Sequence, residues 1–208
     1  MQDRANKDLF DLISALAGNS DFTAAEISQL LALANRRFSQ AYNKTPYWVR
    51  YLTVGEERTI ANSIVPFTQT SKTNIGEFLR IHREEPFLKN STIDFEFFVE
   101  SDGAHVINLT ASDATSVFVT YRQPLTLLTD LDTDGSNSRN EVPGEYFLFM
   151  AHATYADFLR MDGQHSKAAF EEEIADGFLA ESLDNPQQVY NNNTVGHRIK
   201  TYVSQQSR

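Results

Sequence analysis

The apolar residues at the start of the chain recur every three or four positions, which is the spacing of one helix face. Within residues 3–17 they predict a first helix that ends at Gly18. A second helix should begin after Thr23, because Thr23 and Glu26 have the spacing of a capping box. We therefore expect two N-terminal helices across residues 3–43.

Between residues 56 and 128 the apolar positions alternate with polar ones, which is the period of β-strands. Turn-forming residues separate the alternating segments, and the SDG sequence at 101–103 predicts a hairpin. About five strands of this kind predict a small antiparallel sheet or sandwich with one buried face. The segments read RTIANSIVPF, EFLRIH, TIDFEFFVE, AHVINLT and TSVFVTYR.

Helical spacing returns after the β part. Pro143 suits the first turn of a helix, and a last helix is expected from about residue 166 to 182. Its aromatic and aliphatic residues lie four apart: Phe170, Ile174 and Phe178. The predicted fold class is α+β. It is one domain over residues 1–184, with N-terminal helices, a small antiparallel β-sheet or sandwich insertion, a C-terminal helical pair at 143–183 and an extended tail at 185–208.

Composition permits a buried core, since 41% of the 208 residues are hydrophobic. There is no cysteine, which excludes disulfides and thiolate metal sites. The net charge of −10 is unevenly placed: residues 130–184 carry 13 acidic and 3 basic residues, whereas 185–208 carry three basic residues and no acid. An acidic body disfavours sequence-specific nucleic-acid binding, and the basic tail could dock on an acidic neighbour.

The chain begins with a polar, charged segment that lacks the apolar core of a signal peptide. The most apolar run, YFLFMAHATYADFL, is too short and too interrupted to span a bilayer. We expect an intracellular or particle-bound protein without a membrane partner.

The segment TDLDTDGSNSRNE, residues 129–141, matches the calcium-loop template at its defining positions. Calcium prefers hard oxygen ligands, and a twelve-residue loop supplies them at fixed spacing. The candidate Ca²⁺ ligands are Asp130, Asp132, Asp134, Ser136 and Glu141.

Two features of this loop differ from an EF-hand. The eighth position, normally apolar, is Asn137, and a strand rather than a helix precedes the loop. No second loop is present with which it could pair. A lone divalent-ion site and an Asx-rich connector without an ion both remain compatible with the sequence.

The remaining polar residues do not form a sequence motif of a known catalytic or metal site. The five histidines form no pair at the spacing of a zinc site, and no nucleophile elbow or phosphate-binding loop is present. The acidic run 171–173 lies on successive helix positions that do not face each other. Arg160, Asp162 and Gln164 surround a tight turn and are expected to set helix–helix geometry. We predict that the protein is not an enzyme and requires no cofactor.

Four segments of the chain carry a family resemblance. They are ALANRRFSQAYNKTPYW at 32–48, IGEFLRIHREEPF at 75–87, SVFVTYRQPL at 116–125 and EVPGEYFLFMAHATYADFLRMDGQHSKAAFEEEIADGFLAESLD at 141–184. Together they resemble the head-to-tail adaptor (connector) proteins of tailed bacteriophages. The resemblance spans most of residues 10–184, and the strand ending in YR and the later helical block are its most characteristic parts.

The resemblance implies a structural virion protein in the neck, between head and tail, after assembly from the host cytoplasm. It implies a homo-oligomeric ring that contacts the portal protein and a downstream tail or tail-terminator protein. DNA would pass through the ring without specific binding, and the tail segment would reach the portal. Tyr121 and Arg122 at a strand end are candidates to meet a neighbour. The alternatives are a calcium-stabilised β binding module and another tail-completion protein.

Overall fold

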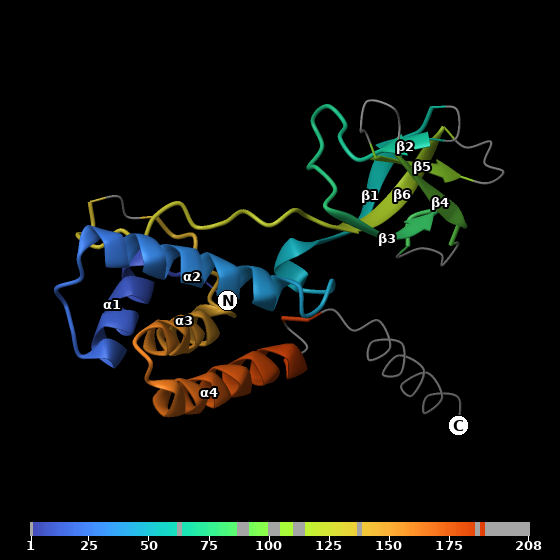
Figure 1. The fold of residues 1–208 in the computed structure, drawn as a ribbon. Helices are drawn as coiled ribbons and strands as arrows, with labels where there is room; N and C mark the ends of the chain where they lie inside the picture. Colours follow the sequence, from blue (N-terminus) through green and yellow to red (C-terminus); the bar gives the residue numbers. More distant parts are fainter. Residues whose placement is uncertain are drawn as a thin grey trace, which may run out of the picture. The chain divides into compact units, whose positions relative to one another are not determined.

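The computed structural model describes most of the chain. The chain divides into two compact units. We call them the helical unit, residues 1–45 with 126–208, and the β unit, residues 46–125 (Figure 1). The residues described are 2–61, 64–86, 92–99, 105–109, 115–136, 139–185 and 188–189.

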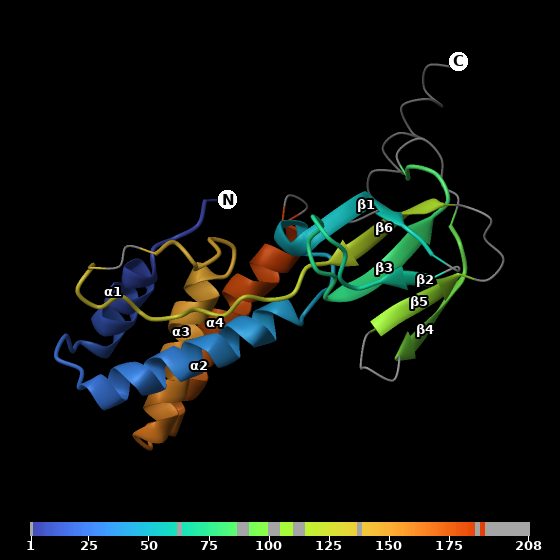
Figure 2. The ribbon, with the colours of Figure 1, turned by 90° about the horizontal axis from the view of Figure 1, so that it is seen from above.

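The helical unit is organised around one helix that packs against the other three. This central helix is α3, which contacts α1, α2 and α4 (Figures 1 and 2). Eight of its fifteen residues are buried, which agrees with its position among the other helices. The helix bounds are Asn6–Ala17 for α1, Ala24–Tyr42 for α2, Phe147–Met161 for α3 and His165–Asp184 for α4.

Local signals in the sequence set two of the helix ends. Gly18 has a left-handed φ of 64° and its N–H closes α1, as its position predicted. The capping box before α2 is formed: the Thr23 hydroxyl accepts from the Glu26 N–H, and the Glu26 carboxylate accepts from the Thr23 N–H. Pro143 does not lie in α3. Its carbonyl accepts from the Tyr146 N–H in a turn that leads into the helix.

The buried face of α4 is built from small residues. Its buried residues are Ala168, Ala175 and Leu179, whereas Phe170 is 63% exposed. Of the three larger side chains spaced four apart, Ile174 and Phe178 are half-buried, and Phe178 packs against His152 of α3. The position of Phe170 on the surface was not predictable from its spacing.

In the described part of the β unit, six strands follow a short 3-10 turn at Val49–Tyr51. They make two antiparallel sheets. The predicted run RTIANSIVPF splits into the end of β1 and the separate strand β2, which raises the expected five strands to six. The sheet orders are β1-β6-β3 and β2-β5-β4. The bounds are Leu52–Thr59 (β1), Ile64–Pro66 (β2), Glu77–His82 (β3), Phe95–Val99 (β4), His105–Leu109 (β5) and Ser116–Arg122 (β6).

Backbone hydrogen bonds also connect the two sheets at their edges. Beyond β1, Ala61 and Ile64 exchange two bonds at the start of β2. Before β4, the Ile93 N–H donates to the Ile81 carbonyl of β3 at 2.9 Å. The chain of pairings therefore runs through all six strands, as in a small barrel or closed sandwich.

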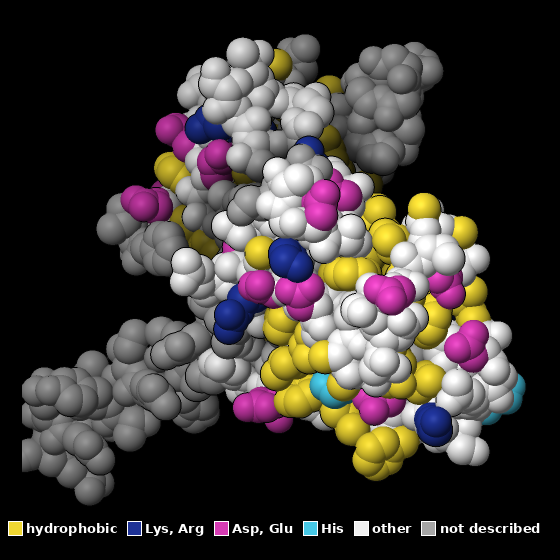
Figure 3. Space-filling model, turned by 90° about the vertical axis from the view of Figure 1, so that its left-hand side faces the viewer, with side chains coloured by type: hydrophobic (Ala, Val, Ile, Leu, Met, Phe, Trp, Pro, Cys, Tyr) yellow, Lys and Arg dark blue, Asp and Glu magenta, His cyan; other side chains and the backbone are white. Residues whose placement is uncertain are grey.

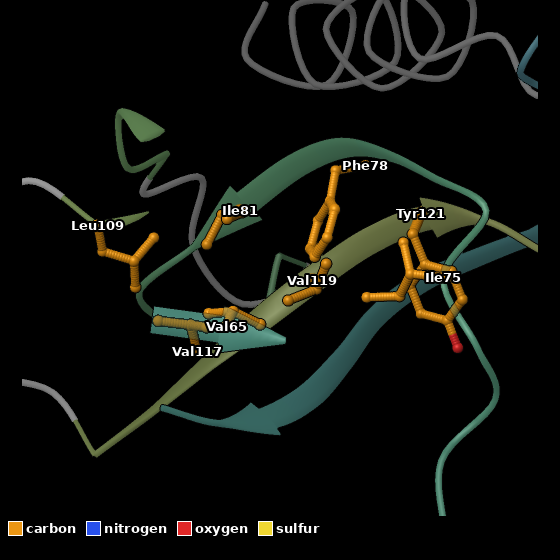
Figure 4. Packing of buried hydrophobic residues seen from close by; sticks show 8 residues of the cluster. All are labelled: Val65, Ile75, Phe78, Ile81, Leu109, Val117, Val119 and Tyr121. Carbon is orange, nitrogen blue, oxygen red and sulfur yellow. The ribbon is translucent and has the colours of Figure 1, made fainter. Parts of the chain in front are cut away.

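Apolar side chains from both sheets fill the centre of the β unit (Figure 4). The alternation predicted from the sequence is confirmed in β6, where successive odd positions are buried. The cluster comprises Val65, Ile75, Phe78, Ile81, Leu109, Val117, Val119 and Tyr121.

Two predicted features lie partly or wholly outside the described residues. β4 and β5 pair antiparallel with Val99 opposite His105, as a hairpin requires, but the SDG turn between them is not described. Of the predicted extended tail, 185–208, only residues 185 and 188–189 are described. The described fold confirms the α+β class.

Candidate functional site

The calcium-like loop is attached to the start of α1 by one buried asparagine. The Asn6 amide donates to the Asp130 carbonyl and to the Glu141 carboxylate, both at 2.9 Å. Its oxygen accepts from the Glu141 N–H at 3.1 Å. Asn6 is fully buried, so these bonds also satisfy its own polar atoms.

The Glu141 carboxylate is bound from several sides. It accepts from the Thr129 N–H at 3.0 Å in addition to the bond from Asn6. The Arg139 guanidinium lies 3.7 Å from the Glu141 carboxylate and 3.9 Å from that of Asp130, and it donates to the Thr129 hydroxyl. The positive charge of Arg139 therefore lies near the carboxylates at both ends of the loop, those of Asp130 and Glu141.

Burial opposes ionisation of Glu141, but the hydrogen bonds from Thr129 and Asn6 outweigh it and hold the pKa of Glu141 below its ordinary value. Arg139 acts in the same direction. The ionised carboxylate is therefore the form that the folded loop selects, and it is selected by hydrogen-bond donors of the protein.

Asp132 and Asp134, in the middle of the loop, accept the hydrogen bonds that form a tight turn. Asp132 is buried with a φ of 47°, and its carbonyl accepts from the Gly135 N–H. The Asp134 carboxylate accepts from the Ser136 N–H at 2.9 Å, and this bond lowers the pKa of Asp134. The first bond is that of a β-turn and the second is that of an Asx-turn, and both also occur in loops that hold no ion.

The five predicted calcium ligands are neighbours in the loop. The Glu141 carboxylate accepts hydrogen bonds from Asn6 and Thr129, and that of Asp134 accepts one from Ser136. Among the described residues no group of three or more histidine, aspartate or glutamate side chains is placed to hold a metal ion. Two loop positions, 137 and 138, lie outside that part of the chain. Asp134 and Glu141 accept hydrogen bonds from the protein itself, and a calcium titration tests whether the loop also binds an ion.

A second group of charged residues joins α2, α3 and α4. Arg37 on α2 forms a two-bond pair with Asp157 on α3, at 2.7 and 2.6 Å, and both are almost fully buried. Arg37 also contacts Glu172 on α4 at 3.1 Å. Arg160 bonds both acids, and its hydrogen bond lowers the pKa of Glu172. The predicted role of Arg160 in helix–helix geometry matches these contacts.

Sequence reasoning missed Arg37 and Asp157. A signal was present: Arg37 lies three residues after Ala34 and seven after Leu30, on the buried stripe of α2. An arginine on such a stripe needs an acidic partner, because an unpaired buried charge is costly. The partner could not be chosen from thirteen acids in the C-terminal part by sequence alone.

Another polar contact joins α3 to α4. His152 Nδ1 lies 2.7 Å from the Glu171 carboxylate, and the His152 ring also packs against Phe178. Burial, followed by the nearby Glu171 charge, raises the pKa of Tyr155. The acidic run of α4 is thus divided, with Glu171 and Glu172 facing α3 and Glu173 facing solvent.

The β unit contains a buried arginine of its own. Arg58 on β1 is fully buried, 2.6 Å from Glu56, and its guanidinium lies over the Tyr121 ring at 5.2 Å from the centroid. The Tyr121 hydroxyl donates to Glu56 at 2.9 Å. Tyr121, expected at a contact with a neighbouring subunit, is fully buried within this chain and belongs to the core of the β unit. Arg122 pairs with Glu77 at 3.1 Å within the same sheet.

Two hollows lie along the pair α3–α4. One is bordered by Tyr155, Leu159 and the exposed Phe170. The other, which we call the end groove, lies where α4 ends beside the start of α3. It is lined by Glu145, Leu148, Phe178, Glu181, Asn185 and Gln188. Figure 3 shows a face on which hydrophobic side chains lie among acidic ones, with few basic ones.

None of the helices in the described part of the chain is both long and apolar enough to cross a membrane. No protein-family model matches the sequence, and no curated protein matches it.

Proposed function

We propose that this protein is a structural adaptor of a tailed-bacteriophage neck. In this proposal copies of the chain form a ring that joins the portal vertex to the tail and surrounds the DNA exit channel. The protein has no enzymatic role, and its partners are other copies of itself, the portal protein and a downstream tail protein. It resides in the virion after assembly from the host cytoplasm.

The observation that carries the proposal is where the resembling residues lie in the fold. The block YADFLRMDGQ at 155–164 forms the end of α3 and the turn into α4. Within it, Asp157 and Arg160 bind Arg37 of α2 and Glu172 of α4. The residues that carry the resemblance therefore connect α2, α3 and α4. This is the role expected of residues that a protein shares with a family of the same fold.

The second resembling segment, SVFVTYR, forms β6. β6 is the central strand of its sheet, since it pairs with β1 on one side and β3 on the other. Its Val117, Val119 and Tyr121 are fully buried. A small β unit inserted between helical segments in this way supports an adaptor architecture.

Charge is compatible with a channel component. α4 carries six acidic residues and one basic residue. Acidic surfaces repel the DNA backbone, so DNA can move past them without being held.

Quantitative mass spectrometry of purified particles tests the proposal. We expect a fixed copy ratio of this chain to the portal protein, close to one, and cross-links between the two. Absence of the chain from particles would overturn the structural role. Presence at a fixed ratio with cross-links only to the distal tail would favour the tail-completion alternative.

A further inference from the structure

We propose that the end groove binds residues 197–203 of the same chain, HRIKTYV. The groove is made by two helix ends that are held together. The Ser182 hydroxyl of α4 donates to the Glu145 carbonyl, just before α3, at 2.8 Å. The floor of the groove belongs entirely to the helical unit, so it is present in each copy of the chain.

The lining combines apolar and acidic side chains. Leu148 is 42% exposed and Phe178 is half-buried, so the floor offers apolar surface to a ligand. Glu145 and Glu181 line the same hollow, and none of the described residues that line it is a lysine or an arginine. Such a lining favours an occupant that alternates apolar side chains with basic ones.

The volume argues for a peptide side chain and against a metabolite. The end groove measures about 160 Å³. Pockets for small molecules usually measure roughly 300–1,000 Å³ and enclose most of the ligand. A shallow groove of this size instead accommodates one or two side chains of an extended segment.

Residues 197–203 have the matching chemistry. Arg198 and Lys200 are basic, and Ile199, Tyr202 and Val203 are apolar. No acid occurs anywhere in residues 185–208, so no part of that segment is repelled by the groove. Residues 197–203 therefore match the end groove both in charge and in apolar content.

Proximity favours the chain's own segment over another copy's. Asn185 and Gln188, directly after α4, are part of the groove wall. Eight residues separate Val189 from Arg198. At roughly 3.3–3.6 Å per extended residue, this length suffices to turn back to the groove. A short linker keeps the segment at an effective concentration in the millimolar range.

Chymotrypsin cleavage after Tyr202, followed by mass spectrometry of the full-length protein, tests this docking. Docked residues are cleaved slowly. In the double variant Glu145→Gln with Glu181→Gln we expect cleavage about fivefold faster, the effect of losing two exposed ion pairs. The matched control is Glu173→Gln with Asp176→Gln, two exposed acids of α4 that do not line the groove. It should leave the rate unchanged.

A charge swap excludes indirect effects of the groove variants. Arg198→Glu with Lys200→Glu should speed cleavage in the wild-type background. Combining it with Glu145→Lys and Glu181→Lys should restore slow cleavage, because the pairs are re-formed in the opposite sense. Circular dichroism of each variant verifies that the helices are intact.

Equal cleavage rates in the wild type and the groove variant would overturn the docking. So would protection that disappears on dilution, because binding within one chain does not depend on protein concentration. The inference is independent of the proposed neck role: the docking test uses the isolated protein, whereas the particle ratio tests the role.

Discussion

At the scale of single residues, Arg37 and Asp157 carry opposite charges in the interior of the helical unit. Asp157→Ala leaves Arg37 buried without its main partner, and this should lower the free energy of unfolding by about 3–5 kcal/mol. Glu172→Ala removes an acid that is 34% exposed and should cost less than about 1 kcal/mol. Urea unfolding measures both. Equal losses would contradict the assignment of Arg37–Asp157 as the central pair.

Glu141 provides a pH-dependent contribution. Its folded-state pKa is lowered below the ordinary 4.5, so its stabilisation is complete above that value and is lost as the pH falls through the folded-state pKa. Glu141→Gln removes this contribution. The difference in unfolding free energy between wild type and variant should therefore shrink as the pH is lowered from 7 to about 3. A difference that stays constant over this range would contradict the argument.

The same residues give an expectation for calcium. Since Asn6, Thr129 and Arg139 already bind Glu141, we expect millimolar Ca²⁺ to leave the thermal midpoint unchanged. A rise in the midpoint that Asp134→Asn abolishes would show that the loop rearranges around an ion. Magnesium at equal concentration controls for ionic strength.

At the scale of elements, α4 packs by its alanine-rich face. Leu179→Ala should destabilise the protein by about 2–5 kcal/mol, because a buried leucine leaves a cavity. Phe170→Ala should change stability by less than about 0.5 kcal/mol, because Phe170 is largely exposed. Thermal unfolding of both variants distinguishes the two faces. A large loss for Phe170→Ala would mean that α4 is rotated.

At the scale of the whole molecule, the helical unit and the β unit each have a core. Val119→Ala should raise hydrogen exchange in the strands β1, β3 and β6, since Val119 is buried between them. Exchange in α2, α3 and α4 should be unchanged. Leu159→Ala is the reciprocal control and should affect the helices alone. If either variant raised hydrogen exchange in both units, the two units would unfold together.

Local signals predicted most of the elements. The Thr23–Glu26 capping box, Gly18 and the alternation in β6 depend on residues close together in the chain, and each element that they predict is present. Element ends were less predictable. α3 begins at Phe147 and not near Pro143, because the proline forms a separate turn first.

The calcium-like loop and the charged network needed the tertiary structure. The pattern of residues 130–141 predicted ligands by spacing, but the partner of Glu141 is Asn6, which is 135 residues away. Arg37 and Asp157 are 120 residues apart. Hydrogen-bond partners at such separations are decided by the packing of helices and not by local sequence.

The sequence alone therefore determined the α+β class, the end of α1, the start of α2 and the strand periodicity of β6, because these depend on neighbours in the chain. The tertiary structure alone decided which face of α4 is buried, how β1 and β2 divide the predicted run, and that Tyr121 belongs to the core. Each of these depends on side-chain volume and charge contributed by segments that meet only after folding.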